Sequence, residues 1–269
     1  MEKGDMWRLR RRKTMNSFTN EELAVLEEKY RLTTRTASSS LTIQANGLLD
    51  DQQLCSYLLQ VKDKIKAANT TVAASLFIKR YSFAILIALY SMSVLNKRLD
   101  FSFRNIWIET LDEEEPLWLP SFRFSHLAAD EPGNVDRVKW REEAIQQIFG
   151  GHIDLLFTHV KRQSRLSKLI MWENLYTYIR WMYESLLNTP EYHGQHETLA
   201  NDFHYLVKEG AGSLFGSYHQ NPLLRCESSQ QRVEKNGTVI QKRKTCCLSY
   251  LAGSKGKRCS VCPIDCTSK

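Results

Sequence analysis

Apolar residues recur at helical spacing along most of the chain. The first such segment is EELAVLEEKY, which follows Thr19 and Asn20 as candidate N-caps. A second runs from about Asp50 to Ala68, and a third from Thr70 to about Leu95 is apolar on most sides, so we expect it to be buried in the middle of the protein. Helical spacing returns in residues 140–149, 152–163, 169–187 and 196–207. This pattern predicts a mainly helical protein.

Strand-like alternation is confined to two places. Residues 101–124 alternate aromatic or branched residues with polar ones around the acidic turn DEEEP, as paired strands do. Near the C-terminus, RVEK and TVIQK flank Asn236-Gly237 and predict a tight hairpin, after a turn at Asn221–Arg225. We therefore expect an α+β fold: a mainly α-helical body with a small antiparallel sheet and a C-terminal metal-binding segment.

The aromatic helix at residues 169–187 has two interpretations. Trp172, Tyr176, Ile179 and Tyr183 recur at three- and four-residue intervals, and Trp181 lies on a neighbouring face. Packing into the core is the simpler interpretation, and a platform on which a ligand stacks is the alternative.

The sequence favours a cytoplasmic protein with no stable membrane insertion. The longest apolar run, Tyr81–Leu95, is too short for a span and lies between Lys79-Arg80 and Lys97-Arg98, so we expect a core helix. Residues 1–14 predict a disordered basic leader with no signal peptide, with Met15 as an alternative start, followed by a body at 15–224 and a basic segment at 225–269.

Positive charge is concentrated in the C-terminal segment. The net charge is +7, and from Arg225 onward ten Lys or Arg stand against three acids. Such a segment is typical of nucleic-acid binding, but its charge suits the binding of acidic redox partners and anionic substrates equally well.

Five of the seven cysteines lie in the last twenty-four residues. Cys246 and Cys247 are adjacent, and eleven residues separate them from Cys259-x2-Cys262. Cytoplasmic thiols stay reduced, so crowded cysteines there favour a metal site over disulfides. Cys259-x2-Cys262 fits a zinc knuckle and the doublet does not, whereas a [2Fe–2S] rhomb offers neighbouring cysteines two iron atoms. Spacing alone leaves a cluster, a zinc ion and thiol redox chemistry open.

The cysteine segment also carries a family resemblance. RKTCCLSYLAGSKGKRCSVCP resembles the C-terminal signature of the FhuF-type ferric-siderophore reductases, and residues 76–93, 171–184 and the NPL at 221 are similar to that family and to its relatives among aerobactin-type siderophore synthetases. The resemblance implies a [2Fe–2S] cofactor held by Cys246, Cys247, Cys259 and Cys262. The eleven-residue spacing exceeds the family's usual ten, and Gly253 and Gly256 lie in the lengthened loop.

The resemblance also implies an activity. We expect one-electron reduction of Fe(III) in a siderophore of the hydroxamate or citrate-hydroxamate type, with a ferredoxin or flavodoxin as donor and no catalytic residue beyond the cluster. Basic residues beside the ligands are candidates for electrostatic docking of the donor or the anionic substrate. They are Lys242, Arg243, Lys244, Lys255, Lys257 and Arg258. A non-catalytic zinc-stabilised module with a basic tail is the alternative function.

The other cysteines and the histidines give weaker signals. Cys226 and Cys266 are spare thiols near the motif, and Cys55 lies within a helical pattern. The spacing of His152 with His159, and of His193, His196 and His204, is too loose to predict a second metal site.

Overall fold

The computed structural model describes residues 15–133, 136–228, 231–235, 238–253, 256, 258–259 and 261–264. The leader at 1–14, Lys255, Lys257 and Cys266 lie outside these residues, as does the Asn236-Gly237 turn.

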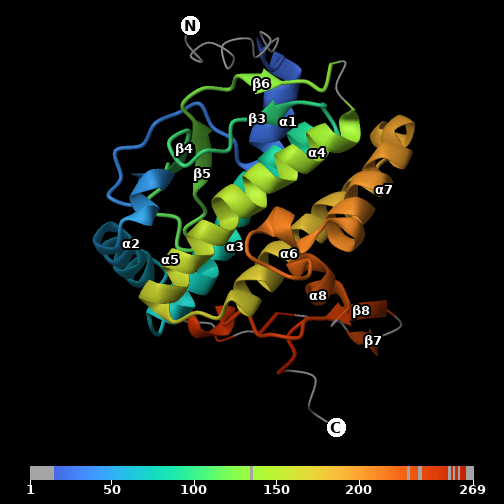
Figure 1. The fold of residues 1–269 in the computed structure, drawn as a ribbon. Helices are drawn as coiled ribbons and strands as arrows, with labels where there is room; N and C mark the ends of the chain where they lie inside the picture. The colour runs from blue at the N-terminus through green and yellow to red at the C-terminus, as the bar shows by residue number, and fades with distance from the viewer. Residues whose placement is uncertain are drawn as a thin grey trace, which may run out of the picture.

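The described chain is mainly helical with small antiparallel sheets (Figure 1). Its α-helices are α1 Asn20–Tyr30, α2 Asp51–Lys64, α3 Thr70–Ser93, α4 Arg137–Ile145, α5 Asp154–Ser164, α6 Lys168–Leu187, α7 His196–His204 and α8 Pro222–Ser228. A π-helical segment at Gln146–Ile153 joins α4 to α5 without a break, and another at Tyr205–Glu209 extends α7. The predicted helical segments and the mainly α-helical α+β class are confirmed.

Local capping determines where several helices begin. The Thr19 side chain accepts a hydrogen bond from the Glu22 amide and Glu22 caps Thr19 in return, which completes a capping box at α1. Asp50, Asn69 and Ser167 are the N-caps of α2, α3 and α6. Each accepts one backbone N–H with its side-chain oxygen.

The segment beginning Asn221-Pro222 forms a helix, so the predicted turn at 221–225 is wrong. The Asn221 side chain accepts a hydrogen bond from the Leu223 amide, and Pro222 occupies the first position of α8. Proline is favoured there because that position needs no amide donor. The residues read as turn signals are therefore a helix start.

The strands of the described residues form three small sheets. β1 Met15–Asn16 and β3 Arg98–Leu99 both pair with β6 Ala129–Asp130, and β2 Ile43–Gln44 pairs with β4 Ile106–Glu109, which pairs with β5 Ser121–Phe124. The predicted pairing within residues 101–124 is the β4–β5 pair, with Ile108 opposite Phe122. β7 Gln231–Lys235 and β8 Thr238–Lys242 pair as the predicted hairpin.

Helix α3 runs through the centre of the molecule and packs along α6 (Figure 1). It is long and apolar enough to cross a membrane by length and composition, but 83% of its most apolar window is buried in this fold. The expected core helix is therefore confirmed. The core interpretation of α6 also holds, because Trp172, Tyr176, Ile179 and Tyr183 are buried, whereas Trp181 is exposed.

Candidate metal centre

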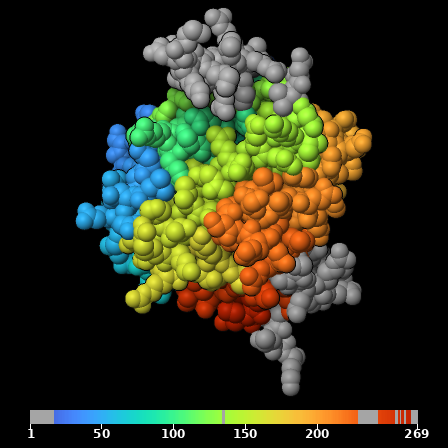
Figure 2. Space-filling model, in the orientation of Figure 1, coloured from blue at the N-terminus to red at the C-terminus, as the bar shows by residue number. Residues whose placement is uncertain are grey.

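The cysteine segment, from Arg243 to Cys262, lies at one end of the body (Figures 1 and 2). Its helical turn contacts α3. After β8 the chain turns inward, passes Cys246 and Cys247, and forms a single helical turn at Ser249–Leu251. Leu248 permits this change of direction by adopting a left-handed conformation with φ of 61°. Beyond the turn, Ala68 donates its amide to the Leu251 carbonyl, and Gly253 donates to the Ile65 carbonyl. The α2–α3 connection therefore fixes the far end of the doublet.

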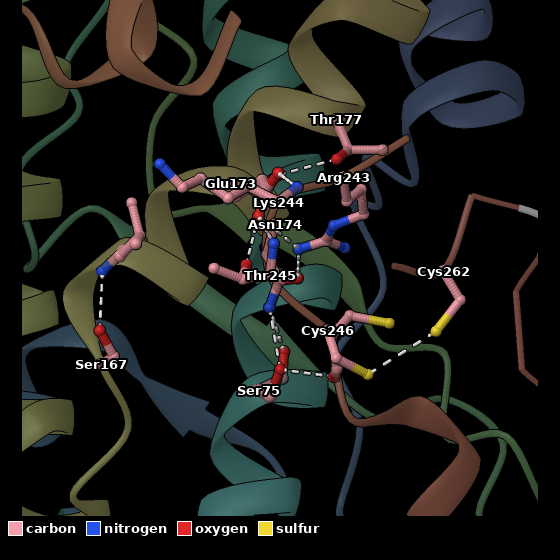
Figure 3. A network of polar contacts seen from close by, with 12 residues as sticks. Ser75, Ser167, Glu173, Asn174, Thr177, Arg243, Lys244, Thr245, Cys246 and Cys262 are labelled. Carbon is pink, nitrogen blue, oxygen red and sulfur yellow. Dashed lines mark hydrogen bonds and ion pairs between the residues drawn. The ribbon is translucent and has the colours of Figure 1, made fainter. Parts of the chain in front are cut away.

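A buried carboxylate on α6 fixes the near end. Glu173 is 1% exposed, and its two oxygens accept the backbone amides of Lys244 and Thr245 at 2.6 and 2.7 Å (Figure 3). The Thr245 hydroxyl donates to the same carboxylate. A buried charge needs such donors, and Glu173 finds them in the two residues before the doublet.

A second chain of hydrogen bonds connects α3, α6 and the doublet (Figure 3). The Ser75 hydroxyl donates to the Cys247 carbonyl at 2.7 Å, and the Asn174 amide donates to Ser75. The Asn174 oxygen in turn accepts the Arg243 guanidinium at 2.7 Å. The backbone that presents Cys246 and Cys247 is thus held by side chains from two core helices.

Arg243 is 5% exposed, which corrects its expected role as a docking charge. Its guanidinium is buried because Asn174 accepts from it and the Glu173 carboxylate lies 3.9 Å away. Its amide donates to the Val261 carbonyl, which joins the doublet side of the segment to Cys259-x2-Cys262. Lys242 is half-buried, while Lys244 and Arg258 are exposed, with Arg258 over the Tyr250 ring at 5.1 Å.

The four motif cysteines form two sulfur pairs. Cys246 Sγ lies 4.0 Å from Cys262 Sγ, and Cys247 and Cys259 line one pocket together. Each pair thus joins one member of the doublet to one member of the Cys-x2-Cys motif. In the described part of the chain no three His, Cys, Asp or Glu side chains gather around one point. Four cysteine thiolates are the ligand set of either a [2Fe–2S] cluster or one zinc ion.

Hydrogen-bond donors surround the sulfurs, as they do at iron–sulfur sites. The Leu248 amide donates to Cys246 Sγ at 3.4 Å, and the Ser249 hydroxyl lies 3.2 Å from Cys247 Sγ. The Lys79 ammonium of α3 lies 3.8 Å from Cys247 Sγ. The donor set and its surroundings therefore fit a thiolate-ligated cluster.

The electrostatic environment favours a thiolate at Cys247. Interaction with the Cys259 thiol lowers the pKa of Cys247 against the opposing effect of burial, and the Lys79 charge lowers it further. The same sulfur contact raises the pKa of Cys259, and burial raises the pKa of Cys246. Metals bind the thiolate form, so the Lys79 charge beside Cys247 favours ligation there.

The remaining cysteine and histidine expectations are consistent with structural roles. Cys226 is buried, and burial raises its pKa to about 12, so it stays a neutral thiol. His152 is enclosed by the core between the Tyr81 hydroxyl and the Phe101 carbonyl. His159 lies against Asp51 and Arg162 at the surface.

Sequence reasoning missed the residues that build the site from the body. Ser75, Lys79, Glu173 and Asn174 lie on core helices far from the cysteines in sequence. The sequence signal that could have identified them is the occurrence of polar residues at positions expected to be buried. These are a serine and a lysine in the apolar helix α3, and Glu-Asn on the buried face of α6.

A pocket opens beside one of the two sulfur pairs. It has a volume of about 340 Å³, and its walls include Lys79, Phe83, Tyr178, Trp181, Cys247 and Cys259. The second pair, Cys246 and Cys262, is not part of its lining. The two pairs therefore differ in their access to small molecules.

A family model described as ferric iron reductase FhuF-like transporter matches residues 75–233, more than half of the chain. The matched range begins at Ser75 and contains Lys79, Glu173 and Asn174, while the four motif cysteines follow it. Comparison with curated proteins and with solved structures gives no match.

Proposed function

We propose that this chain, which belongs to the family of ferric iron reductase FhuF-like transporters, reduces Fe(III) bound to a siderophore. The electron passes through a [2Fe–2S] cluster held by Cys246, Cys247, Cys259 and Cys262. The observation that carries the proposal is the gathering of the four motif cysteines: Cys246 Sγ lies 4.0 Å from Cys262 Sγ, and Cys247 and Cys259 line one pocket. When bound, such a cluster supplies a one-electron carrier, and all-cysteine forms lie near −400 mV in plant-type ferredoxins.

The reaction suits a one-electron carrier. Hydroxamate and carboxylate oxygens are hard, anionic donors that hold Fe(III) far more tightly than Fe(II). One electron converts the bound Fe(III) to Fe(II), and the weakened complex then releases the metal. No proton transfer or nucleophile is required, so the protein's own residues need only hold the ligands, tune their charge and position the substrate.

The residues around the sulfurs have distinct tasks under this proposal. Glu173, Asn174 and Ser75 hold the backbone of the doublet, and the Leu248 amide and Lys79 offset the negative charge on the sulfurs. A reduced ferredoxin or flavodoxin supplies the next electron to the oxidised cluster after each turnover, in the cytoplasm, where such donors are present. Exposed Lys244 and Arg258 and half-buried Lys242 supply positive charge for an acidic donor, and nucleic acid and the membrane are not partners in this scheme.

The test is anaerobic purification followed by stopped-flow mixing. We expect a coloured protein with stoichiometric iron and acid-labile sulfide, whose dithionite-reduced form is reoxidised by ferric siderophores with release of Fe(II). A colourless protein containing zinc would instead support the zinc-stabilised binding module and overturn the cluster. A cluster that no ferric siderophore reoxidises would overturn the reductase function alone.

A further inference from the structure

The pocket beside Cys247 and Cys259 has the dimensions of a small-ligand site. Helix α3 supplies Lys79 and Phe83 to its walls, α6 supplies Tyr178 and Trp181, and the cysteine segment closes one side. Its volume of about 340 Å³ lies in the range typical of pockets for small molecules. A compact complex fits this concave site better than the broad surface of a donor protein.

Aromatic side chains form one wall of the pocket. The Phe83 and Tyr178 rings pack with centroids 5.4 Å apart, and Trp181 beside them is 47% exposed. The other tryptophan of α6, Trp172, is buried in the core. A large exposed indole at the mouth of a pocket provides apolar contact area that is covered when an organic ligand binds.

Three cations lie in or near this wall. Arg31 lies over the Phe83 ring at 5.0 Å, and Lys79 faces Cys247. Arg80 donates to backbone carbonyls alone, at Leu76, Leu117 and Trp118. In the described part of the chain no carboxylate oxygen lies within 4.0 Å of a nitrogen of these three cations. Of the three, Lys79 lines the pocket, while Arg31 and Arg80 lie beyond its lining and add to the positive charge around it.

The buried arginine of the pocket wall has spare donor capacity. Arg243 uses one terminal nitrogen on Asn174, while its buried Nε has no hydrogen-bond partner among the described residues. A buried donor left unpaired costs free energy that a ligand oxygen or a water would recover. This observation is independent of the exposed aromatic wall and also points to an oxygen-rich ligand.

We propose that this pocket binds the substrate complex itself, and that it selects a ferric complex with net negative charge and an oxygen-rich organic shell, as in citrate-hydroxamate siderophores. The proposal rests on the proposed function, because the pocket is assigned to the electron-transfer substrate by its contact with Cys247 and Cys259. Carboxylates of the shell lie toward Lys79, with Arg31 and Arg80 beyond the pocket lining, and the hydrocarbon arms lie against Trp181 and Phe83. Cys247 and Cys259 are then the cluster-ligating cysteines nearer to the substrate.

Binding can be measured without electron transfer by using gallium(III), which has the charge of Fe(III) and is not reduced. Calorimetric titration of the cluster-loaded protein with gallium(III) aerobactin, an anionic citrate-hydroxamate complex, is expected to show one site. Trp181→Ala should weaken binding about tenfold. Leu155→Ala removes a residue of matched exposure, 46%, from α5 outside the pocket and should leave the affinity unchanged.

Charge selection needs a second variant and a second ligand. Arg31→Gln should weaken the anionic complex by about threefold, with a smaller effect at high salt, and should not weaken the cationic gallium(III) complex of desferrioxamine B. Equal affinity of wild type, Trp181→Ala and Arg31→Gln for the anionic complex would overturn the pocket assignment. So would weakening of both complexes alike by Arg31→Gln, because the site would then lack charge selection.

Reduction kinetics separate this proposal from the function on which it rests. Dithionite-reduced protein is mixed with ferric aerobactin, and the half-saturating concentration should rise in Trp181→Ala while reoxidation by hexacyanoferrate(III) stays as in wild type. If wild type binds the gallium complex but reduces no ferric siderophore, the reductase function fails and the site stands. If wild type reduces ferric aerobactin with the same concentration dependence as Trp181→Ala, the function stands and the site fails.

Discussion

Replacement of Lys79 by methionine should lower the reduction potential of the cluster. The Lys79 ammonium lies 3.8 Å from Cys247 Sγ, on the side of the sulfur that faces the pocket. Adding an electron to the cluster makes the site more negative, and a nearby positive charge stabilises that reduced state. Methionine keeps the length and packing of the side chain and removes the charge.

The structure gives the size of this effect. Two unit charges 3.8 Å apart attract by about 4 kcal/mol at an effective dielectric constant of about 20. The added electron resides mainly on iron, at roughly twice that distance, which leaves about 2 kcal/mol, and partial solvent exposure of Lys79 reduces it to about 1–2 kcal/mol. At 59 mV per tenfold change for a one-electron couple, the expected fall is about 40–90 mV.

Spectroelectrochemical titration of the cluster-loaded protein measures this shift directly. Lys79→Arg retains the charge and should stay near the wild-type potential. Lys62→Met removes a charge from α2, where Lys62 pairs with Asp63, and should leave the potential unchanged. A fall of less than about 10 mV in Lys79→Met, or an equal fall in Lys62→Met, would refute the electrostatic reasoning.

Three further changes test the anchoring of the segment and the core. Glu173→Gln replaces one acceptor oxygen by a donor against the amides of residues 244 and 245, a cost of about 1–3 kcal/mol, so iron content and cluster lifetime under a chelator should fall. Glu184→Gln, half-exposed on the same helix, is the control, and equal lifetimes would contradict the anchor. His152 is buried, and desolvation lowers its pKa to about 3. Below pH 6.5 its imidazole is therefore protonated in the unfolded chain and stays neutral in the folded chain. Its contribution to stability therefore falls by about 1.4 kcal/mol per pH unit as the pH drops from 6.5 toward 3, and urea unfolding of His152→Gln should lack this component. Cys226→Ala should retain full iron content by metal analysis, and a colourless variant would make Cys226 a ligand.

Helix positions were largely predictable from the sequence because they depend on neighbours a few residues apart. Thr19 with Glu22 is a capping box that can be read from spacing, and the apolar positions of α3 and α6 repeat at the helical period. The exception, Asn221-Pro222, shows the limit of local rules. The same residues can open a turn or cap a helix, and packing of α8 against α6 accompanies the second outcome.

Exposure of the basic residues could not be predicted from charge. Lys242, Arg243 and Lys244 are consecutive cations with similar preferences for the surface, yet Arg243 is buried and Lys244 is exposed. The difference arises because Asn174 and Glu173 lie beneath this point of the chain and accept hydrogen bonds from Arg243 and from the Lys244 amide. Composition carries no information about such partners.

The sequence by itself determined the helical body, the β hairpin and the crowding of Cys246, Cys247, Cys259 and Cys262 in one short segment, since these follow from short-range spacing. Only the tertiary structure decided how the sulfurs pair and what surrounds them. Ser75 meets the Cys247 carbonyl across 172 residues of sequence, and Lys79 meets Cys247 Sγ across 168. Contacts of that range are fixed by the packing of α3 against α6 and of the C-terminal segment against both, which no local pattern encodes.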